Sequence, residues 1–260
     1  MSTEEIIQKI AAAKKYKALY PKTIARVVLD CARKHPAQLV EQKARNILHQ
    51  IWGIFYPTRP NFQKMLEHFA IEIKRGQDVK TAVLPLLRLH ASTKERISCL
   101  DQFYERIFAV TGKPETILDL ASGLNPLTYF WLPEGVTYFA YDIDQEQAHF
   151  LQKIFKLLKV NRVKIGLGDV FSDRFPKTDV VFLLKILPLI YQQQKTKSLE
   201  ILEKQEAEHL VVSFPTKTVS GKEKGMAEFY AKQFEELVKE KPWLVTKILF
   251  PTELIFIIKK

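Results

Sequence analysis

Cysteine, long apolar runs and clustered metal ligands are all scarce in this chain of 260 residues. The two cysteines, Cys31 and Cys99, lie far apart, which excludes a disulfide framework and is typical of a reducing cytoplasm. None of the six histidines stands beside a cysteine at the spacing of a zinc site, so we expect no metal. No apolar run reaches the about 18 residues of a membrane span, and residues 1–5 lack the pattern of a signal peptide. We therefore expect a cytoplasmic protein without membrane contact.

Glycine is also scarce, with nine residues, and the dinucleotide fingerprint G-x-G-x-x-G is absent. Residues 115–127 nevertheless predict an apolar strand, a tight turn at Gly123 and a helix that begins at Pro126 with Asn125 as its N-cap. Such a turn places backbone N–H groups at the carboxyl end of a strand, where open α/β sheets bind nucleotide-like ligands. A ligand without a pyrophosphate needs fewer glycines, and S-adenosylmethionine is such a ligand.

Strands and helices alternate after this turn, which predicts an α/β protein with a mostly parallel sheet. The expected elements are a strand at 136–141, a helix at 145–158, a strand at 163–167 and a strand at 179–184.

Acidic residues stand at or just after the ends of three strands. Asp142 lies about 20 residues beyond the first strand, the distance at which a carboxylate meets ribose hydroxyls in nucleotide-binding units. We expect Asp119 to orient the turn and the methionine amino group, and Asp169 with Val170 to frame the adenine. Any one of these residues could instead be an ordinary turn former. The candidate cofactor-binding residues are Asp119, Ala121, Gly123, Asn125, Pro126, Asp142, Ile143, Asp169, Val170 and Leu184.

Positive charge is concentrated in the first part of the chain. Residues 1–110 carry 19 Lys and Arg against 10 Asp and Glu, whereas residues 111–260 carry 21 against 19. The first part also has apolar residues at helical spacing. A basic helical module in front of a sheet is what a polyanionic substrate requires, although a solvated helical surface would look similar. The candidate phosphate contacts are Lys14, Lys15, Lys17, Lys22 and Arg26.

Four segments of the chain are similar to sequence motifs of a known protein family. They are Leu-Asp-Leu-Ala-Ser-Gly-Leu-Asn-Pro-Leu (118–127), Leu-Leu-Lys-Ile-Leu-Pro (183–188), Val-Val-Ser-Phe-Pro-Thr-Lys (211–217) and Glu-Leu-Ile-Phe-Ile-Ile (253–258). Together they resemble the Arm/Rmt aminoglycoside-resistance methyltransferases, and the similarity covers nearly the whole chain. The resemblance implies a class I S-adenosylmethionine-dependent methyltransferase fold, Rossmann-like, with an N-terminal α-helical domain. It also implies methylation of guanine N7 in the decoding-site helix of 16S rRNA within the small (30S) ribosomal subunit.

By the same resemblance, Phe214 and Lys217 line the entry for the target base, and Lys222 and Lys224 hold RNA. The chain departs from the family at Ser122, where members commonly have Cys, and at Ile190, where a Glu usually follows the Leu-Pro segment. The loop 218–222 also replaces a more glycine-rich, Arg-ending loop.

The predicted reaction asks for alignment more than for acid–base chemistry, because guanine N7 already carries a free lone pair. The Asn/Asp-Pro-Pro-aromatic motif of amino-methyltransferases is absent, and residues 184–188 stand in its place. Lys185 could donate a hydrogen bond to guanine O6 or could pair with a nearby carboxylate. Lys185 and Phe214 are therefore the candidate catalytic residues.

We expect two domains, a basic helical RNA-binding domain at 1–105 and a methyltransferase domain at 106–260 that binds the cofactor by itself, in a monomeric protein. Three alternatives remain at this point. The target could be the neighbouring adenine N1 or another RNA, the substrate could be a small molecule, or the chain could be a non-catalytic RNA-binding protein with a methyltransferase fold.

Overall fold

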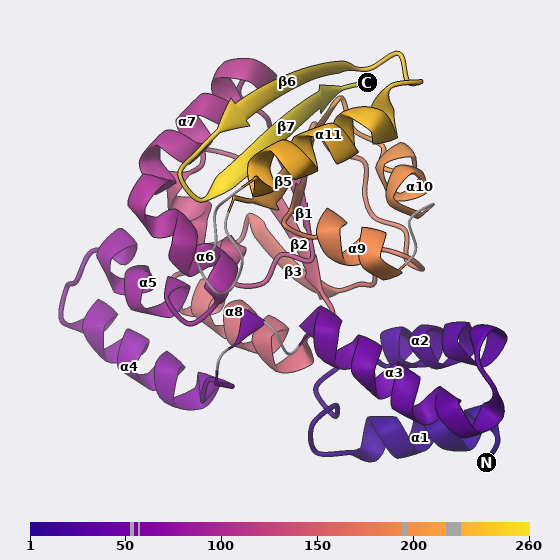
Figure 1. Ribbon diagram of the computed structural model, residues 1–260. Coiled ribbons are helices and arrows are strands. Elements are labelled where there is room, and N and C mark those ends of the chain that lie inside the picture. The colour runs from indigo at the N-terminus through magenta and orange to yellow at the C-terminus, as the bar shows by residue number, and fades with distance from the viewer. Residues whose placement is uncertain (53–54, 57, 194–196, 217–224) are drawn as a thin grey trace.

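The computed structural model describes residues 1–52, 55–56, 58–193, 197–216 and 225–260. At its centre lies a seven-stranded sheet with the strand order β3-β2-β1-β4-β5-β7-β6 (Figure 1). The strands are β1 (Thr116–Leu120), β2 (Thr137–Asp142), β3 (Val163–Leu167), β4 (Val180–Leu184), β5 (His209–Pro215), β6 (Leu244–Leu249) and β7 (Glu253–Lys259).

The first five strands run parallel, and β7 pairs antiparallel with both β5 and β6. The order of the strands reverses at β1, which has β2 on one side and β4 on the other. Ligands of open α/β sheets bind outside the carboxyl ends of the strands at such a switch point. The predicted class I, Rossmann-like methyltransferase fold is confirmed, and the four strands expected at 117–184 are all present.

Helices cover both faces of the sheet (Figure 1). One face of the sheet, which includes Phe182, packs against α4, α5, α7 and α8. The other face, which includes Val181, packs against α9, α10 and α11. The alternation along β4 explains both cores, because successive side chains of a strand point to opposite faces. The helices of this part are α4 (Phe62–Lys74), α5 (Val79–Leu87), α6 (Ala91–Arg96), α7 (Leu100–Thr111), α8 (Gln145–Leu157), α9 (Leu187–Gln193), α10 (Lys197–Glu203) and α11 (Met226–Val238), with short 3-10 helices η2 (Ile97–Cys99) and η3 (Asn125–Trp131).

The remaining three helices form a separate bundle at the N-terminal end. They are α1 (Thr3–Ala12), α2 (Pro21–Lys34) and α3 (Ala37–Trp52). Their buried side chains, among them Ile10, Val28 and Leu48, make a core of their own, whereas α4, α5 and α7 share a core with the sheet. The expected division near residue 105 therefore does not coincide with the division of the apolar cores, which falls between α3 and α4. Helical periodicity could not reveal this, because it shows that a face is buried but not against which partner.

The segment after β1 also differs from its prediction. Residues 125–131 form the 3-10 helix η3, whose N-cap is Leu124 and has no side-chain capping bond. Asn125 turns its side chain into the buried interior instead. None of the helices in the described ranges is long and apolar enough to cross a membrane.

Candidate active site

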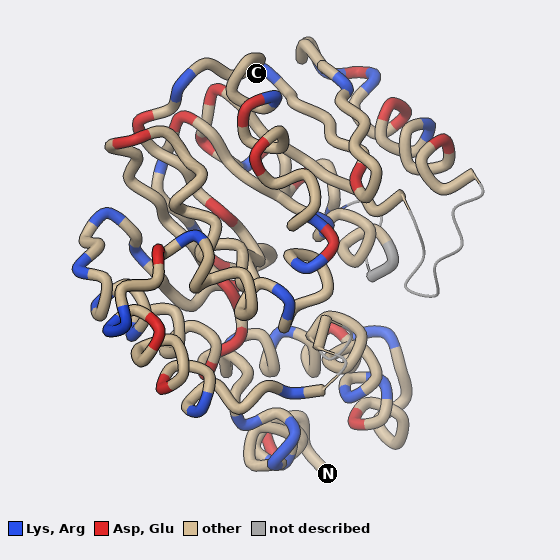
Figure 2. The backbone as a smooth tube through the Cα atoms, turned by 90° about the vertical axis from the view of Figure 1, so that its left-hand side faces the viewer, with Lys and Arg blue, Asp and Glu red and all other residues tan. Residues whose placement is uncertain are grey.

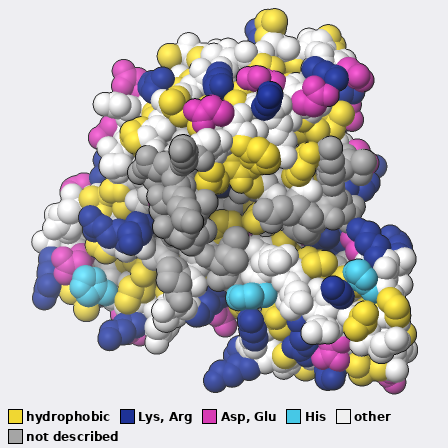
Figure 3. Space-filling model, in the orientation of Figure 1, with side chains coloured by type: hydrophobic (Ala, Val, Ile, Leu, Met, Phe, Trp, Pro, Cys, Tyr) yellow, Lys and Arg dark blue, Asp and Glu magenta, His cyan; other side chains and the backbone are white. Residues whose placement is uncertain are grey.

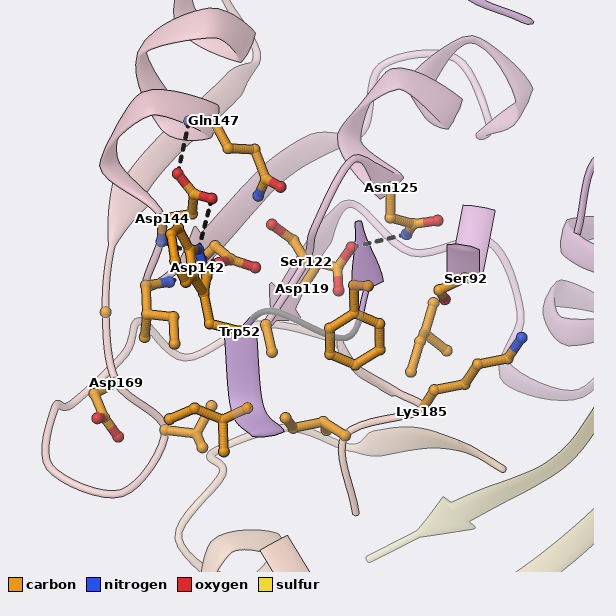
Figure 4. A pocket seen from close by; sticks show the side chains of 18 of the residues that line it. Trp52, Ser92, Asp119, Ser122, Asn125, Asp142, Asp144, Gln147, Asp169 and Lys185 are labelled. Carbon is orange, nitrogen blue, oxygen red and sulfur yellow. Dashed lines mark hydrogen bonds between the residues drawn. The ribbon is translucent and has the colours of Figure 1, made fainter. Parts of the chain in front are cut away.

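An open cavity lies at the carboxyl ends of the central strands, where open α/β sheets bind their ligands. Residues of α2 and α3, among them Thr23, Arg26 and Trp52, form one wall, and strand-end residues such as Asp119 and Asp142 form the other. Figure 4 shows the carboxylates of Asp119, Asp142 and Asp144 grouped on one side, with Lys185 along the opposite side. The cavity is therefore built jointly by the N-terminal bundle and the sheet.

Asp119 is held by a buried polar network at the end of β1. One carboxylate oxygen accepts hydrogen bonds from Asn125 Nδ2 at 2.8 Å and from the Tyr138 hydroxyl. The other oxygen is buried without a partner among the described residues, and burial raises the pKa of this carboxyl to about 6. A buried acceptor without a donor is costly, so this wall of the cavity suits a ligand that carries a hydrogen-bond donor.

Arg96 determines which way the Asn125 amide faces. Its Nη1 donates to Asn125 Oδ1 at 2.7 Å, so the amide nitrogen of Asn125 is left to donate to Asp119. The same guanidinium forms a bidentate pair with Glu253 of β7, at 2.8 and 3.0 Å. Burial disfavours both charges, but the Arg96 and Lys185 charges outweigh it and keep the pKa of Glu253 below its usual value.

Asp142 closes the turn between β1 and η3. Its carboxylate accepts backbone hydrogen bonds from Gly123 at 2.8 Å, from Ile143 at 2.7 Å and from Asp144 at 3.1 Å. Gly123 has φ +54°, and a Cβ there would lie 2.9 Å from the His90 ring, so a side chain at this turn would be both strained and crowded. Burial raises the pKa of the Asp142 carboxyl to about 6 despite these three bonds.

Two arginines from the N-terminal part neutralise the other acidic residues of the cavity. Arg59 pairs with Asp144, which also accepts a hydrogen bond from Trp52 Nε1 at 2.8 Å. Arg26 donates from Nε to Asp169 at 2.9 Å and lies over the Phe171 ring. Asp119 and Asp142 have no such cationic partner among the ion pairs of the described residues.

His90 forms part of the cavity wall as a neutral side chain. Its ring stacks on Phe55, with 5.2 Å between centroids, and Tyr56 meets it edge-on. Burial, with the charges of Arg96 and Lys185, lowers the pKa of this imidazole to about 3. Its Nδ1 atom has no hydrogen-bond partner in the described structure.

Lys185 follows β4 with a positive φ of 59°. Its ammonium pairs with Glu95 at 2.5 Å and lies 3.5 Å from Glu253. Figure 4 shows the side chain running along the cavity with its ammonium pointing away from Asp119 and Asp142. Of the two roles considered for Lys185, pairing with a carboxylate is thus the one present in this structure.

The comparisons with known proteins agree with this geometry. Residues 12–257 match the family described as ribosomal RNA methyltransferase (FmrO). A 16S rRNA (guanine(1405)-N(7))-methyltransferase of Frankia casuarinae is 32% identical over 100% of this chain and 94% of its own length. Another, of Serratia marcescens, is 34% identical over 100% of this chain and 99% of its own. The chain belongs to the FmrO family of ribosomal RNA methyltransferases.

A solved member of similar architecture is the 16S rRNA methyltransferase RmtF in complex with S-adenosyl-L-homocysteine. It superposes with a TM-score of 0.84 at 27% identity and covers 100% of this chain and 99% of its own. The resemblance to the aminoglycoside-resistance methyltransferases is thus confirmed. Membership of an rRNA methyltransferase family also removes support from the small-molecule and non-catalytic alternatives.

Most of the predicted cofactor residues of this family member do line the cavity. They are Asp119, Ala121, Asn125, Asp142, Ile143, Asp169, Val170 and Leu184. Gly123 does not line the cavity, but its N–H donates a hydrogen bond to Asp142, which does. Pro126 is buried in η3 and does not line the cavity either.

Two predicted site residues lie elsewhere than their predicted roles would place them. Phe214 is buried against Tyr230, Phe234 and Phe256 in the core between the sheet and α11, and it is not part of the cavity wall. Its position in β5 directs this side chain to the α11 face, which a motif by itself does not show. Arg26 lies in the cavity wall, where its guanidinium donates to Asp169, so the predicted contact with an RNA phosphate would require Arg26 to leave this ion pair.

The remaining basic candidates fall into two groups. Lys14, Lys15 and Lys17 are exposed in the turn between α1 and α2, and Lys22 is exposed and pairs with Asp173 at 3.0 Å. Figure 2 shows the Lys and Arg positions along the backbone of this N-terminal bundle, and Figure 3 shows Lys and Arg side chains on one of its faces. The other three, Lys217, Lys222 and Lys224, lie outside the described residues.

Sequence reasoning missed a whole wall of the cavity. The residues it did not identify include Thr23, Trp52, Tyr56, His90, Ser92 and Arg96. The one available signal was the polar run 90–96, which follows an apolar stretch and ends in an arginine. Ile190, at the position where the family resemblance implied a Glu, contributes an apolar and fully buried side chain to the wall.

Proposed function

We propose that this protein transfers a methyl group from S-adenosylmethionine to N7 of a guanine in the decoding-site helix of 16S rRNA, within the small ribosomal subunit. The observation that carries the proposal is full-length similarity to relatives named for this guanine N7 activity, combined with a cavity of suitable chemistry at the switch point of the sheet. The protein would act as a monomer in the cytoplasm and confer resistance to aminoglycosides that contact this guanine.

The residues of the cavity fit the cofactor. S-adenosylmethionine supplies an electrophilic methyl group on a sulfonium, and it presents hydrogen-bond donors at its ribose hydroxyls and its ammonium. Asp142 is placed to accept from the ribose hydroxyls, and the unpartnered oxygen of Asp119 from the ammonium. Neutral His90 adds no positive charge beside a cationic ligand.

For the RNA, we assign guanine positioning to Lys185. Its partner Glu95 is about half exposed, at 48% for the side chain, so this ion pair can be exchanged for a hydrogen bond to guanine O6. We assign the contacts with RNA phosphates to two groups of lysines. They are Lys14, Lys15, Lys17 and Lys22 in the N-terminal bundle, and Lys217, Lys222 and Lys224 outside the described residues.

The deciding experiment is methylation of intact small subunits with isotope-labelled S-adenosylmethionine, followed by mass spectrometry of the digested rRNA. One N7-methylguanine in the decoding-site helix is expected, with none on large subunits as the control. A methyl group on the neighbouring adenine N1 would replace this assignment by its alternative. Expression in a susceptible bacterium, with an Asp142→Ala variant as control, tests the resistance.

A further inference from the structure

The exposed lysines of the N-terminal bundle stand on a turn that is anchored from within. Lys14, Lys15 and Lys17 are exposed, whereas Tyr16 between them is only 3% exposed. The Tyr16 hydroxyl donates a hydrogen bond to the Arg45 carbonyl of α3 at 3.1 Å. The turn therefore moves with the bundle rather than as a free loop.

This turn continues directly into a segment that is bonded to the loop after β2. Residues 18–20 lie antiparallel to residues 143–145, with an isolated β-bridge between Leu19 and Asp144. Tyr20 N donates to the Ile143 carbonyl at 2.7 Å, and Gln145 N donates to the Ala18 carbonyl at 2.8 Å. The Gln145 side chain adds a third bond, from Nε2 to the Leu19 carbonyl at 2.8 Å.

The loop that receives these bonds also belongs to the cofactor cavity. Ile143 lines the cavity, and its N–H, like that of Asp144, donates to the Asp142 carboxylate. A displacement of residues 18–20 would thus reach Asp142 through the two peptide groups that orient it. Only a few residues separate the exposed lysines from the candidate ribose acceptor along this path.

The contact between the bundle and the sheet is suited to movement of the bundle as a unit. The bundle has its own apolar core, and much of its contact with the sheet is polar, through Arg26 with Asp169, Lys22 with Asp173 and Trp52 with Asp144. Polar contacts between separately packed parts of a chain commonly permit relative motion. Trp52 and Tyr56 moreover line both the cofactor cavity and the adjoining surface hollow beside Lys14, Lys15 and Lys17.

We propose that residues 18–20, through their hydrogen bonds to residues 143–145, position the cofactor loop, so that RNA bound at the lysine turn and cofactor bound beside Asp142 strengthen each other. Gln145 is the positioning residue whose side chain serves this contact. The inference rests on the proposed function, because it takes the lysine turn as an RNA contact. Linkage requires the effect to be equal in both directions.

The first test measures binding of the full-length protein to intact small subunits, with and without saturating S-adenosylhomocysteine, which cannot donate a methyl group. Affinity for the subunits should rise by at least about fivefold with the ligand, the lower end of usual coupling factors. The affinity for S-adenosylhomocysteine should rise by the same factor when subunits are present. Equal subunit affinities with and without the ligand would overturn the proposal.

The second test separates this contact from helix stability in general. Gln145→Ala removes the side-chain bond to the Leu19 carbonyl, one of the three hydrogen bonds of this contact, and should lower the coupling factor at least about twofold. Gln152→Ala is the matched control, because Gln152 lies on the same helix and donates to the Ile165 carbonyl of β3 at 3.0 Å instead. Equal loss of coupling in both variants would contradict the assignment to Gln145.

The two proposals fail in different ways. If the subunits are methylated at guanine N7 but the coupling factor is one, only the coupling is wrong. If the protein neither binds nor methylates small subunits, the proposed function itself is wrong and the coupling fails with it. A thermal unfolding curve of each variant with an unchanged midpoint confirms that a lost coupling factor does not reflect loss of the fold.

Discussion

Arg96 and Glu253 form a bidentate ion pair in which each side chain is 1% exposed. The pair joins the segment before α7 to the antiparallel strand β7, 157 positions later in the chain. Because Arg96 also orients Asn125, the pair connects the C-terminal strand to the Asp119 wall of the cofactor cavity. The guanidinium of Arg96 therefore takes part both in the ion pair with Glu253 and in orienting Asn125 beside the cavity.

Breaking this pair should destabilise the fold strongly. Glu253→Gln leaves the buried Arg96 charge without its counterion, and loss of one partner of a buried pair typically costs about 3–5 kcal/mol. The free energy of unfolding from urea titration measures this cost. Glu236→Gln is the matched control, because Glu236 pairs with Lys239 on the surface, and its unfolding midpoint should hardly move. Equal midpoints for the two variants would contradict the importance of the buried pair.

Replacing Asp142 should weaken the cofactor. Asp142→Ala removes the acceptor proposed for the ribose hydroxyls and leaves the N–H groups of Gly123 and Ile143 without their partner. A lost hydrogen bond to a charged group is worth about 1.5–3 kcal/mol, which corresponds to roughly a tenfold to hundredfold loss of affinity. Calorimetry with S-adenosylmethionine measures it, with Asp101→Ala as a control that only loses a bond from Trp131. Parental affinity in Asp142→Ala would exclude the ribose role.

Cofactor binding should weaken as the pH falls below about 6. Burial raises the pKa values of Asp119 and Asp142 to about 6, so both carboxylates take up protons there and accept hydrogen bonds less well. Since the pKa values are raised above those of the unfolded chain, protonation favours the folded state, and stability contributed by these groups rises as pH falls. Calorimetry between pH 5 and 8 should show that the affinity for the cofactor falls as the pH is lowered. Unfolding curves at the same pH values should show that the contribution of Asp119 and Asp142 to stability is not lost. His90, with a pKa of about 3, stays neutral throughout.

Lys185 should affect the substrate more than the cofactor. Lys185→Ala removes the proposed contact to guanine O6, and one such contact contributes about 1–3 kcal/mol, so methylation of small subunits should fall roughly tenfold to hundredfold. The affinity for S-adenosylmethionine should stay near that of the parent. Lys164→Ala, at an exposed position of β3, is the control for a lost lysine. A variant that loses cofactor affinity to the same extent as activity would assign Lys185 to the cavity instead.

The lysine turn should determine the salt dependence of ribosome binding. Neutralising Lys14, Lys15 and Lys17 removes three candidate phosphate contacts, and each lost contact should lower the slope of log affinity against log salt by about 0.7–0.9. The matched control neutralises three exposed lysines at the end of the sheet where the parallel strands begin, opposite the cavity. These are Lys113, Lys177 and Lys259. An unchanged slope in the first variant would favour a merely solvated turn.

The succession of the first four strands along the chain and the carboxylates at strand ends could be predicted from the sequence, because they depend on residues that are neighbours in the chain. Apolar strands of five residues, the helix at α8 and the turn at Gly123 each follow from residues that are neighbours in the chain. Asp119 and Asp142 lie at the carboxyl ends of β1 and β2, and Asp169 follows β3. Parallel strands bring these ends to one side of the sheet. The position of the cofactor cavity was therefore predictable.

Tertiary structure alone decided what encloses that cavity and which charges in it are free. The sequence predicted Arg26 to be a phosphate contact on the surface of a helix, yet its guanidinium pairs with Asp169, 143 positions away. Asn125 had the pattern of a helix cap, yet the buried Arg96 charge draws its amide oxygen inward. Both outcomes depend on burial and on partners distant in the chain, and a desolvated charge selects its partner by proximity in space. Periodicity and motif spacing report only what lies within a few residues, so the sequence placed the site, and packing supplied its second wall.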